Sequence, residues 1–265
     1  MNTVNVLNAR QLQATEQQIR YYRENGFVQL DDVITPEELA ELREYLDETM
    51  GAAGSNAVQT DKAGGAYYKV LNQRVNTWRD HGGMGKFSLS ERFAGLARQL
   101  TGASGMRLFH DHALYKMPQD SKPTPWHQDF PYWPMKDSGA LSLWLTLDDV
   151  DENNGCMMFI PKSQKLKNLK SVDFLEPHDL FDETKGQTDR NTAVVVRMKA
   201  GSCTFHDGLT FHYAHANQTD RPRRVLAIIF MPDGTIYNGK PHVVSDGQNL
   251  AAGEPFRGPM FPLLA

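Results

Sequence analysis

His127 is followed two positions later by a carboxylate, because the chain reads His127-Gln128-Asp129. In a β-strand, residues two positions apart project from the same face, roughly 7 Å apart along the chain, so both side chains can converge on one ion. Two histidines and one carboxylate form the ligand set of non-haem Fe(II) oxygenases, which leaves further coordination positions open. His127 and Asp129 are therefore candidates for two of three metal ligands.

The second histidine of such a site must come from a distant strand. We favour His212, because a hairpin turn centred at residues 217–218 would place it opposite Arg223 on a neighbouring strand, about 4.8 Å away. Arg223 could then bind one end of a short dicarboxylate whose other end chelates the metal, since guanidinium groups pair bidentately with carboxylates and keep their charge. The same segment offers two further histidines, which could have supporting roles: His206 and His215.

Other histidines and aromatic residues have plainer interpretations. His110-Asp111-His112 is a second possible metal pair, but no carboxylate follows at a useful spacing. Large aromatic rings dominate protein cores, so Tyr132, Trp133 and Trp144 are expected to be core residues. Three histidines are expected at the surface or in the core: His110, His178 and His242.

Helices are expected first in the chain and strands later. Helices are predicted over 14–25, with Gly26 as C-cap, from Pro36 onward, and over 90–100. Thr35 is the expected N-cap of the second helix, with Pro36 and Glu38 at favoured first-turn positions. A short strand is predicted over 27–30. Further strands, spaced as in an antiparallel sandwich or small barrel, are predicted over 107–117, 140–150, 156–160, 193–198, 202–206 and 224–231.

Two long segments separate these elements. Residues 51–66 are rich in small residues, and residues 162–191 are mostly polar; loops of the second length are uncommon unless they are functional or flexible. Either segment could order over a pocket when substrate binds. With no repeat or linker, we expect one domain over 1–265: N-terminal helices to about 105, a β core over about 106–232, and a C-terminal cover over 233–265.

Composition excludes several classes of protein. Hydrophobic residues make up 40% and charged residues 23% of 265 residues, which argues against a disordered chain. No apolar run approaches the roughly 18 residues of a membrane-spanning helix, and the N-terminus lacks the pattern of a secretory signal. Two cysteines suit a reducing compartment, so we expect a cytoplasmic protein. The net charge of −4 argues against a nucleic-acid partner.

Several ordered motifs resemble the phytanoyl-CoA dioxygenase (PhyH) family of Fe(II)/2-oxoglutarate oxygenases, which includes ectoine hydroxylase. The resemblance covers most of the chain. It departs from the family pattern at residues 213–215 and 162–164, but neither departure changes a presumed ligand. The segments that carry the resemblance are 21–27, the helix from Pro36, 116–118, 126–130, Trp144 with 148–150, 153–156, 160–163 and 212–224.

The resemblance implies a mainly β fold with flanking helices, a double-stranded β-helix (jelly roll, cupin-like). It implies a non-haem dioxygenase that uses Fe(II), 2-oxoglutarate and O2 to hydroxylate an unactivated C–H bond of a small molecule, with release of succinate and CO2. Because Asp129 is present, halogenation is disfavoured. The implied residues are His127, Asp129 and His212 as iron ligands, Arg223 as the 2-oxoglutarate anchor, and Gln128, Trp144, Lys116 and His112 near the metal or cosubstrate.

The substrate pocket is less well defined by the sequence. Phe130, Tyr132 and Trp133 directly follow the metal-binding motif and are candidates for its wall. Tyr67 and Lys69, with nearby Arg74, follow the small-residue loop and are candidates to close over it. These basic residues favour an anionic small molecule. We expect neither a nucleic-acid nor a membrane partner, and a monomer or a homodimer.

Two other functions fit parts of the pattern. A cupin-type metal dioxygenase that uses three histidines and no 2-oxoglutarate would depend on His206 or His215 more than on Asp129. A non-catalytic jelly-roll binding protein would bind no iron and would tolerate loss of His127, Asp129 and His212. A nucleic-acid demethylase of the same superfamily is disfavoured by the acidic charge balance.

Overall fold

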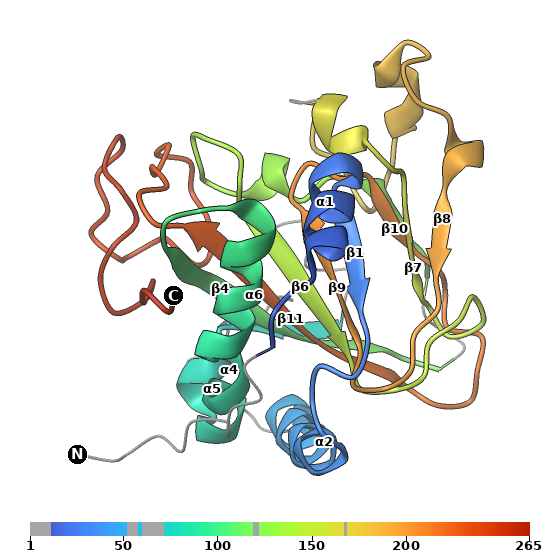
Figure 1. The fold of residues 1–265 in the computed structure, drawn as a ribbon, viewed down its shortest axis with the longest axis horizontal. Helices are drawn as coiled ribbons and strands as arrows, with labels where there is room; N and C mark the ends of the chain where they lie inside the picture. Colours follow the sequence, from blue (N-terminus) through green and yellow to red (C-terminus); the bar gives the residue numbers. More distant parts are fainter. Residues whose placement is uncertain (1–11, 52–57, 60–71, 119–121, 167–168) are drawn as a thin grey trace.

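The computed structural model describes residues 12–51, 58–59, 72–118, 122–166 and 169–265, and Figure 1 shows their arrangement. The helices are α1 (Glu16–Asn25), α2 (Pro36–Gly51), α4 (Thr77–Asp80), α5 (Gly82–Ser88) and α6 (Glu91–Thr101). The strands are β1 (Phe27–Leu30), β2 (Val58–Gln59), β3 (Asn72–Val75), β4 (Met106–Lys116), β5 (Thr124–His127), β6 (Leu141–Thr146), β7 (Met157–Phe159), β8 (Val194–Val196), β9 (Cys203–Asp207), β10 (His212–Ala214) and β11 (Arg223–Pro232).

The helix ends follow the local sequence signals. α1 begins at a capping box between Thr15 and Gln18, and it ends at Gly26, whose φ of 84° is the left-handed conformation that glycine adopts without strain. At α2, the side chain of Thr35 accepts from the backbone N–H of Glu38, and the Glu38 carboxylate accepts from the backbone N–H of Thr35. The three predicted long helices are therefore confirmed, as are the predicted strand at 27–30 and the six later strands.

Two antiparallel sheets face each other. The larger has the strand order β1-β9-β6-β11-β4-β3-β2, and the smaller has the order β5-β10-β7-β8. Two packed antiparallel sheets with helices outside one of them form a jelly roll, so the predicted fold class is confirmed. Short β2, β3, β5 and β10 were not predicted as separate strands, and β2 lies within the segment expected to be a loop. That the whole chain forms one domain stays a prediction.

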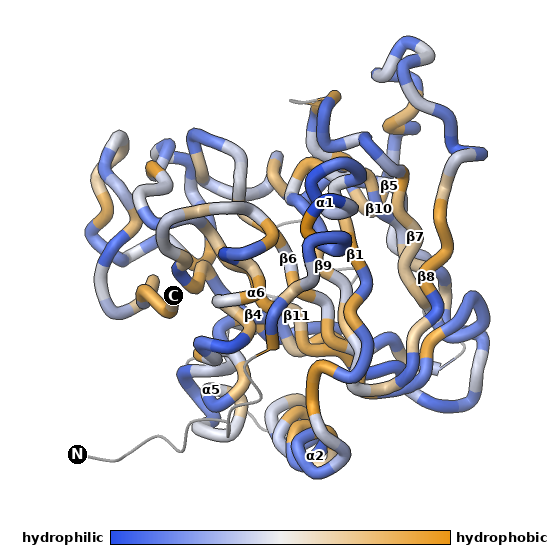
Figure 2. The backbone as a smooth tube through the Cα atoms, viewed as in Figure 1, coloured by the Kyte–Doolittle hydropathy of each residue, from blue (hydrophilic) through white to orange (hydrophobic). Residues whose placement is uncertain are grey.

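The central strands of the large sheet are buried on both faces. Leu141, Leu143 and Leu145 of β6 pack with the apolar sides of α2 and α6. The alternate residues Ser142 and Trp144 instead line a cavity between the sheets. Figure 2 shows hydrophobic stretches along the central strands and hydrophilic ones on the outer loops. The period-2 alternation of a strand thus separates the core face from the cavity face.

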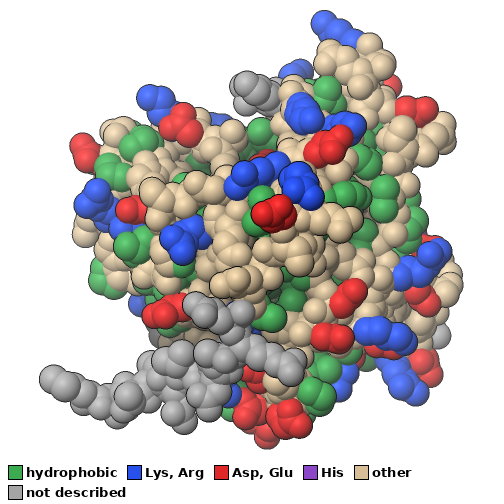
Figure 3. Space-filling model, viewed as in Figure 1, with side chains coloured by type: hydrophobic (Ala, Val, Ile, Leu, Met, Phe, Trp, Pro, Cys, Tyr) green, Lys and Arg blue, Asp and Glu red, His purple; other side chains and the backbone are tan. Residues whose placement is uncertain are grey.

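The remaining features of the fold are the segment after β11 and the outer surface. Phe256 and Phe261 of that last segment pack against Phe109 and Trp133, so the segment covers one end of the large sheet. Basic and acidic side chains are interspersed over the face drawn in Figure 3. Within the described ranges, no helix is both long and apolar enough to cross a membrane.

Asp111 is a buried anchor between β4 and the helices. Its carboxylate accepts hydrogen bonds from the backbone N–H groups of Thr77 and Trp78 at 2.6 and 3.0 Å, and from the Ser88 hydroxyl at 2.6 Å. Asp111→Ala would leave the buried N–H of Thr77 and the partly buried N–H of Trp78 unpaired, so we expect urea unfolding to show a loss of roughly 3 kcal/mol. Exposed Asp137→Ala is the control, with a change within about 0.5 kcal/mol. Equal stability of the two variants would contradict this role.

Candidate active site

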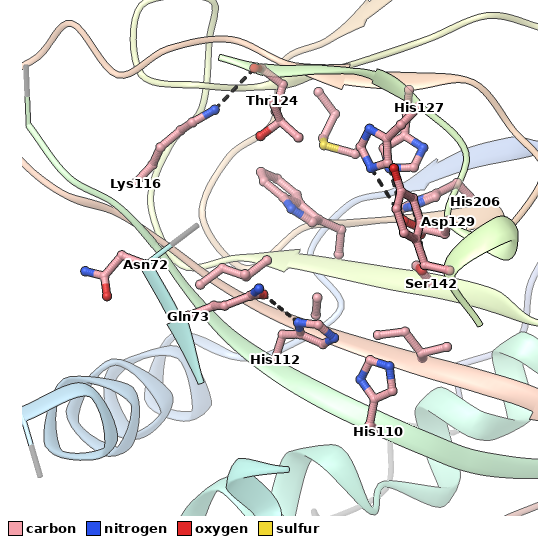
Figure 4. Close-up of a pocket in the computed structure, with 18 of the residues that line it drawn as sticks. Asn72, Gln73, His110, His112, Lys116, Thr124, His127, Asp129, Ser142 and His206 are labelled. Carbon is pink, nitrogen blue, oxygen red and sulfur yellow. Dashed lines mark hydrogen bonds and ion pairs between the residues drawn. The ribbon is translucent and has the colours of Figure 1, made fainter. Parts of the chain in front are cut away.

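Three buried side chains converge in the cavity between the sheets. Nε2 of His127 lies 3.6 Å from Oδ1 of Asp129, and Nε2 of His212 lies 3.5 Å from the same oxygen. These three residues form a group whose candidate ligand atoms all lie within 4.8 Å of one another. Their side chains are at most 10% exposed. Figure 4 shows His127 and Asp129 directed toward each other in this cavity. Two imidazoles and a carboxylate are the donor set of a facial iron site.

The two histidines meet because their strands are neighbours. β10 pairs with β5, which places His212 opposite His127, and the ring centroids lie 4.0 Å apart. The hairpin predicted between His212 and Arg223 is wrong, because β10 belongs to the small sheet and β11 to the large one. The loop between them crosses from one sheet to the other, and the buried amide of Asn217 donates to the backbone carbonyls of Lys116 and Arg221. Arg223 instead lies opposite Lys116.

Asp129 also reaches the site differently from the prediction. β5 ends at His127, and Asp129 has helical backbone angles, φ −77° and ψ −40°, at the start of the short 3-10 helix Phe130–Tyr132. Pro131 within that turn favours the change from strand to helix. The carboxylate makes no capping hydrogen bond to the turn and is directed at the histidines. The two side chains therefore converge through a turn and not along one strand face.

The protonation states suit metal binding. Nδ1 of His127 lies 2.8 Å from the Pro125 carbonyl, and Nδ1 of His212 lies 2.9 Å from the Thr210 carbonyl, so each Nδ1 carries the proton and each Nε2 is the lone-pair atom. Burial, and then His127, lower the pKa of His212 well below its usual value. Burial opposes ionisation of Asp129, but its histidine neighbours outweigh it and hold the pKa well below the ordinary value. Neutral imidazole and ionised carboxylate are the forms that ligate metals.

The second oxygen of Asp129 is held by two residues from the large sheet. The Ser142 hydroxyl donates to Oδ2 at 2.8 Å, and Nε2 of His206 lies 3.4 Å from it. Ser142 and His206 are direct partners on β6 and β9, which explains why both reach the same atom. Ser142 was not predicted as a site residue. A lone serine within an apolar strand indicates a site only when other residues on the same face of the strand are known to line one. His206 has the supporting position that was one of its expected roles.

Arg223 lies in the same cavity, on the large sheet. It is 5% exposed, and its guanidinium lies 5.0 Å from the centroid of the Trp144 ring. Burial lowers its pKa to about 10, so it stays charged at neutral pH. Among the described residues, neither Nε nor Nη1 of Arg223 has a hydrogen-bond partner. A buried cation with unpaired donors is costly unless an anion binds it, so this end of the cavity is built for an anionic group.

Some of the other predicted site residues line the cavity, and others do not. Lys116, Trp144, His112, Tyr132 and Trp133 line the cavity. Gln128 does not line it; its amide donates to the Leu209 carbonyl at 2.7 Å. Phe130 packs against the cluster of the C-terminal segment and does not line the cavity either. Tyr67 and Lys69 lie outside the described residues, as does most of 51–66.

Part of the segment 162–191 lies against the candidate site, at Val172 and Phe174. The Phe174 ring packs edge-on to the His127 ring, with centroids 4.7 Å apart. The hydroxyl of Tyr132 donates to the carbonyl of Val172. This long segment therefore shields one side of the three convergent residues from water. That it opens and closes as a lid stays a prediction.

Two histidines expected at the surface or in the core also line the cavity: His110 and His242. His110 and His112 lie on either side of Asp111 in β4. Because side chains alternate between the two faces of a strand, both imidazoles face the cavity and Asp111 faces the helices. This alternation is the sequence signal that could have placed His110 on the same face as His112. His178 instead is exposed, and its Nε2 lies 3.0 Å from Oε1 of Glu183.

Comparison with known proteins places this geometry in a family. A probable alpha-ketoglutarate-dependent hypophosphite dioxygenase of Stutzerimonas stutzeri is 26% identical over 228 residues, which span 80% of this chain and 77% of that protein. The ectoine dioxygenase of Bordetella parapertussis is 25% identical over 243 residues, spanning 80% of this chain and 74% of that protein.

Solved structures agree with these relatives. The alpha ketoglutarate dependent carbocyclase SnoK from nogalamycin biosynthesis superposes with a TM-score of 0.78 at 25% identity, covering 95% of this chain and 97% of that one. The epimerase SnoN, in complex with Fe3+, alpha ketoglutarate and nogalamycin RO, gives a TM-score of 0.76 at 28% identity, covering 94% and 98%. Residues 22–225 match the family model for phytanoyl-CoA dioxygenase. The resemblance seen in the motifs is confirmed, and the chain belongs to the phytanoyl-CoA dioxygenase (PhyH) family.

Proposed function

We propose that this protein is a non-haem Fe(II)- and 2-oxoglutarate-dependent dioxygenase that hydroxylates a C–H bond of a small molecule. The observation that carries the proposal is the shared cavity: a buried set of two histidines and a carboxylate faces the same space as a buried arginine, two of whose donor nitrogens have no hydrogen-bond partner among the described residues. The relatives named as alpha-ketoglutarate-dependent dioxygenases, and the SnoN structure with Fe3+ and alpha ketoglutarate, support it.

Each of these residues has a defined task in this function. His127, Asp129 and His212 would hold Fe(II), and Arg223 would pair with the far carboxylate of 2-oxoglutarate over the Trp144 ring. Iron with this cosubstrate and O2 supplies the C–H oxidation, which is coupled to formation of succinate and CO2. Ser142 and His206 fix the orientation of the Asp129 carboxylate. Phe174 and Tyr132 exclude water from one side of the site.

The site geometry disfavours the rival three-histidine enzyme. His206 lies against Oδ2 of Asp129, whereas His127 and His212 lie nearest to Oδ1. His206 is not part of the convergent group found among the described residues. His215 is directed at Cys156, with Nδ1 3.7 Å from the sulfur. A binding protein that binds no iron would have no need of this convergent group beside buried Arg223, whose Nε and Nη1 have no hydrogen-bond partner among the described residues.

The experiment that tests the proposal is an anaerobic titration. Fe(II) and then 2-oxoglutarate are added to the metal-free protein, and the weak visible charge-transfer band of the chelated cosubstrate is recorded. We expect a saturable band that depends on both additions. Iron binding without a band would favour the three-histidine dioxygenase, and no iron binding would favour the binding protein.

Ser142→Ala is expected to weaken Fe(II) binding. It removes the hydroxyl that donates to Oδ2 of Asp129, and loss of such a partner of a metal ligand costs about 10- to 100-fold in metal affinity or activity. The measurement is the Fe(II) concentration that gives half of the maximal band. Ser138→Ala, at an exposed position, is the matched control and should behave as wild type. An unchanged Fe(II) requirement in Ser142→Ala would remove this residue from the site.

The substrate is a small molecule, as it is for the named relatives. Basic residues near 67–74 led us to expect an anionic one, but Lys69 lies outside the described residues. That the protein has no nucleic-acid partner stays a prediction. Cytoplasmic location and a monomeric or homodimeric state stay predictions.

A further inference from the structure

Three buried imidazoles form one wall of the cavity, apart from the candidate iron ligands. His110 and His112 project from β4, with ring centroids 4.3 Å apart. His242 joins them from the segment after β11, with its ring centroid 5.9 Å from that of His110. Figure 4 shows His110 and His112 pointing into the cavity, separated from His127 and Asp129. We name His110, His112 and His242 the histidine wall; all three are at most 8% exposed.

His110 lacks the partners that a buried imidazole needs. It is 2% exposed, and within the described part of the chain neither Nδ1 nor Nε2 has a hydrogen-bond partner. Buried polar side chains in native proteins are almost always paired, and leaving one unpaired is costly. Since the ring lines the cavity, a bound molecule can supply the missing hydrogen bond.

The other two rings of the histidine wall are fixed in complementary roles. Nδ1 of His112 lies 2.7 Å from the Gln73 side-chain oxygen, so Nδ1 carries the proton and Nε2 is an acceptor. The backbone N–H of Val244 donates to Nδ1 of His242 at 3.2 Å, so in the neutral ring Nε2 carries the proton. The wall therefore combines donor and acceptor positions. A hydroxyl group can satisfy both, whereas a carboxylate only accepts.

Charge at the wall also opposes an anion. Burial lowers the pKa of His112 to about 3 and that of His242 to about 4, so both are neutral at pH 7. Histidines aside, Arg223 and Lys116 are the basic side chains among the described residues that line the cavity, and burial, followed by the charge of Arg223, lowers the pKa of Lys116 to about 6. Arg223 is assigned to the cosubstrate, and Nζ of Lys116 already donates to the carbonyls of Ala214 and His215. An anionic group at the wall would lose its hydration without gaining an ion pair.

We propose that the histidine wall binds a hydroxyl group of a neutral substrate and so holds that substrate against the iron site. This inference rests on the proposed function, because it assigns Arg223 to 2-oxoglutarate. It replaces the expectation of an anionic substrate with a neutral, hydroxyl-bearing one. The apolar part of such a molecule would lie against Ile229 and Ala227, which are the β11 partners of His110 and His112 and also line the cavity.

A matched pair of probes tests this inference. Saturation-transfer NMR on the protein loaded with Zn(II) and 2-oxoglutarate would compare trans-cyclohexane-1,2-diol with cyclohexanecarboxylate. We expect saturable binding of the diol, at least ten-fold tighter than that of the carboxylate. His110→Phe keeps the ring shape and should weaken diol binding at least ten-fold, while His110→Asn, which keeps a donor and an acceptor, should restore part of it. His178→Phe, outside the cavity, is the control.

The outcomes separate this inference from the proposed function. Equal binding of both probes, no saturable binding of the diol, or unchanged diol binding in His110→Phe would each overturn it. If thermal unfolding shows that His110→Phe does not fold, His112→Phe tests the same wall with the same expected loss. The Fe(II)–2-oxoglutarate band is measured separately: wall-dependent diol binding without that band would overturn the proposed function alone.

Discussion

Asp129→Ala should reduce succinate formation by more than about 100-fold. Loss of a residue that only orients a metal ligand already costs about 10- to 100-fold, and Asp129 is the single carboxylate of the convergent group. Removing it leaves two neutral imidazoles, which lack the negative charge that helps to hold Fe(II). The measurement is succinate formed at saturating Fe(II) and 2-oxoglutarate, with the visible band recorded on the same protein.

A control separates loss of the ligand from loss of the fold. Asp137→Ala removes an exposed carboxylate shortly after the same motif and should keep full activity. The thermal unfolding midpoint of Asp129→Ala should show a folded protein, because the substitution removes a buried charge and creates none. Near-normal succinate formation by Asp129→Ala would refute the two-histidine, one-carboxylate site and would favour the three-histidine alternative.

Arg223→Ala should raise the KM for 2-oxoglutarate by about 100-fold. A hydrogen bond to a charged group is worth about 1.5–3 kcal/mol, Arg223 offers two unpaired donor atoms, and 1.4 kcal/mol corresponds to a factor of ten. The far carboxylate of the cosubstrate would then be buried without a partner. The measurement is succinate formation against 2-oxoglutarate concentration, and kcat should fall less than kcat/KM.

The neighbouring residue provides a matched control for Arg223. Arg224 projects from the other face of β11, where its guanidinium pairs with Asp148 at 2.8 Å and Asp47 at 3.2 Å. Arg224→Ala should therefore leave the KM for 2-oxoglutarate unchanged. Arg223→Lys keeps the charge but loses the planar fork, so its KM should lie between those of wild type and Arg223→Ala. An unchanged KM in Arg223→Ala would remove Arg223 from this role.

Local signals predicted the local structure well. Thr35 and Glu38 cap α2, and Gly26 ends α1, because capping depends on residues a few positions apart. The run from Leu141 to Thr146 forms a strand, because β-strands need only a short apolar or alternating segment. The short strands β5 and β10 were harder to predict, since their stability comes from neighbouring strands and not from their own sequence.

Strand pairing decided the parts of the site that the sequence left open. The interval between His212 and Arg223 fits a hairpin, but burying both sheets requires the chain to cross between them, so His212 meets His127 instead. The turn at Pro131 moved Asp129 off the strand while keeping it beside the same histidine. The prediction that placed His212 beside Arg223 thus relied on a hairpin that does not form, although both residues line the same cavity.

The sequence by itself determined the helix ends, most strands, the candidate metal-binding motif and the family, because each depends on neighbouring residues or on ordered motifs. Only the tertiary structure decided that Ser142 and His206 hold Asp129, that Nε and Nη1 of buried Arg223 have no hydrogen-bond partner in the described part of the chain, and that His110, His112 and His242 share a wall. The physical reason is that these relations arise where two sheets and a terminal segment bury their faces against one another. Such burial depends on residues far apart in the chain, which no local pattern can place.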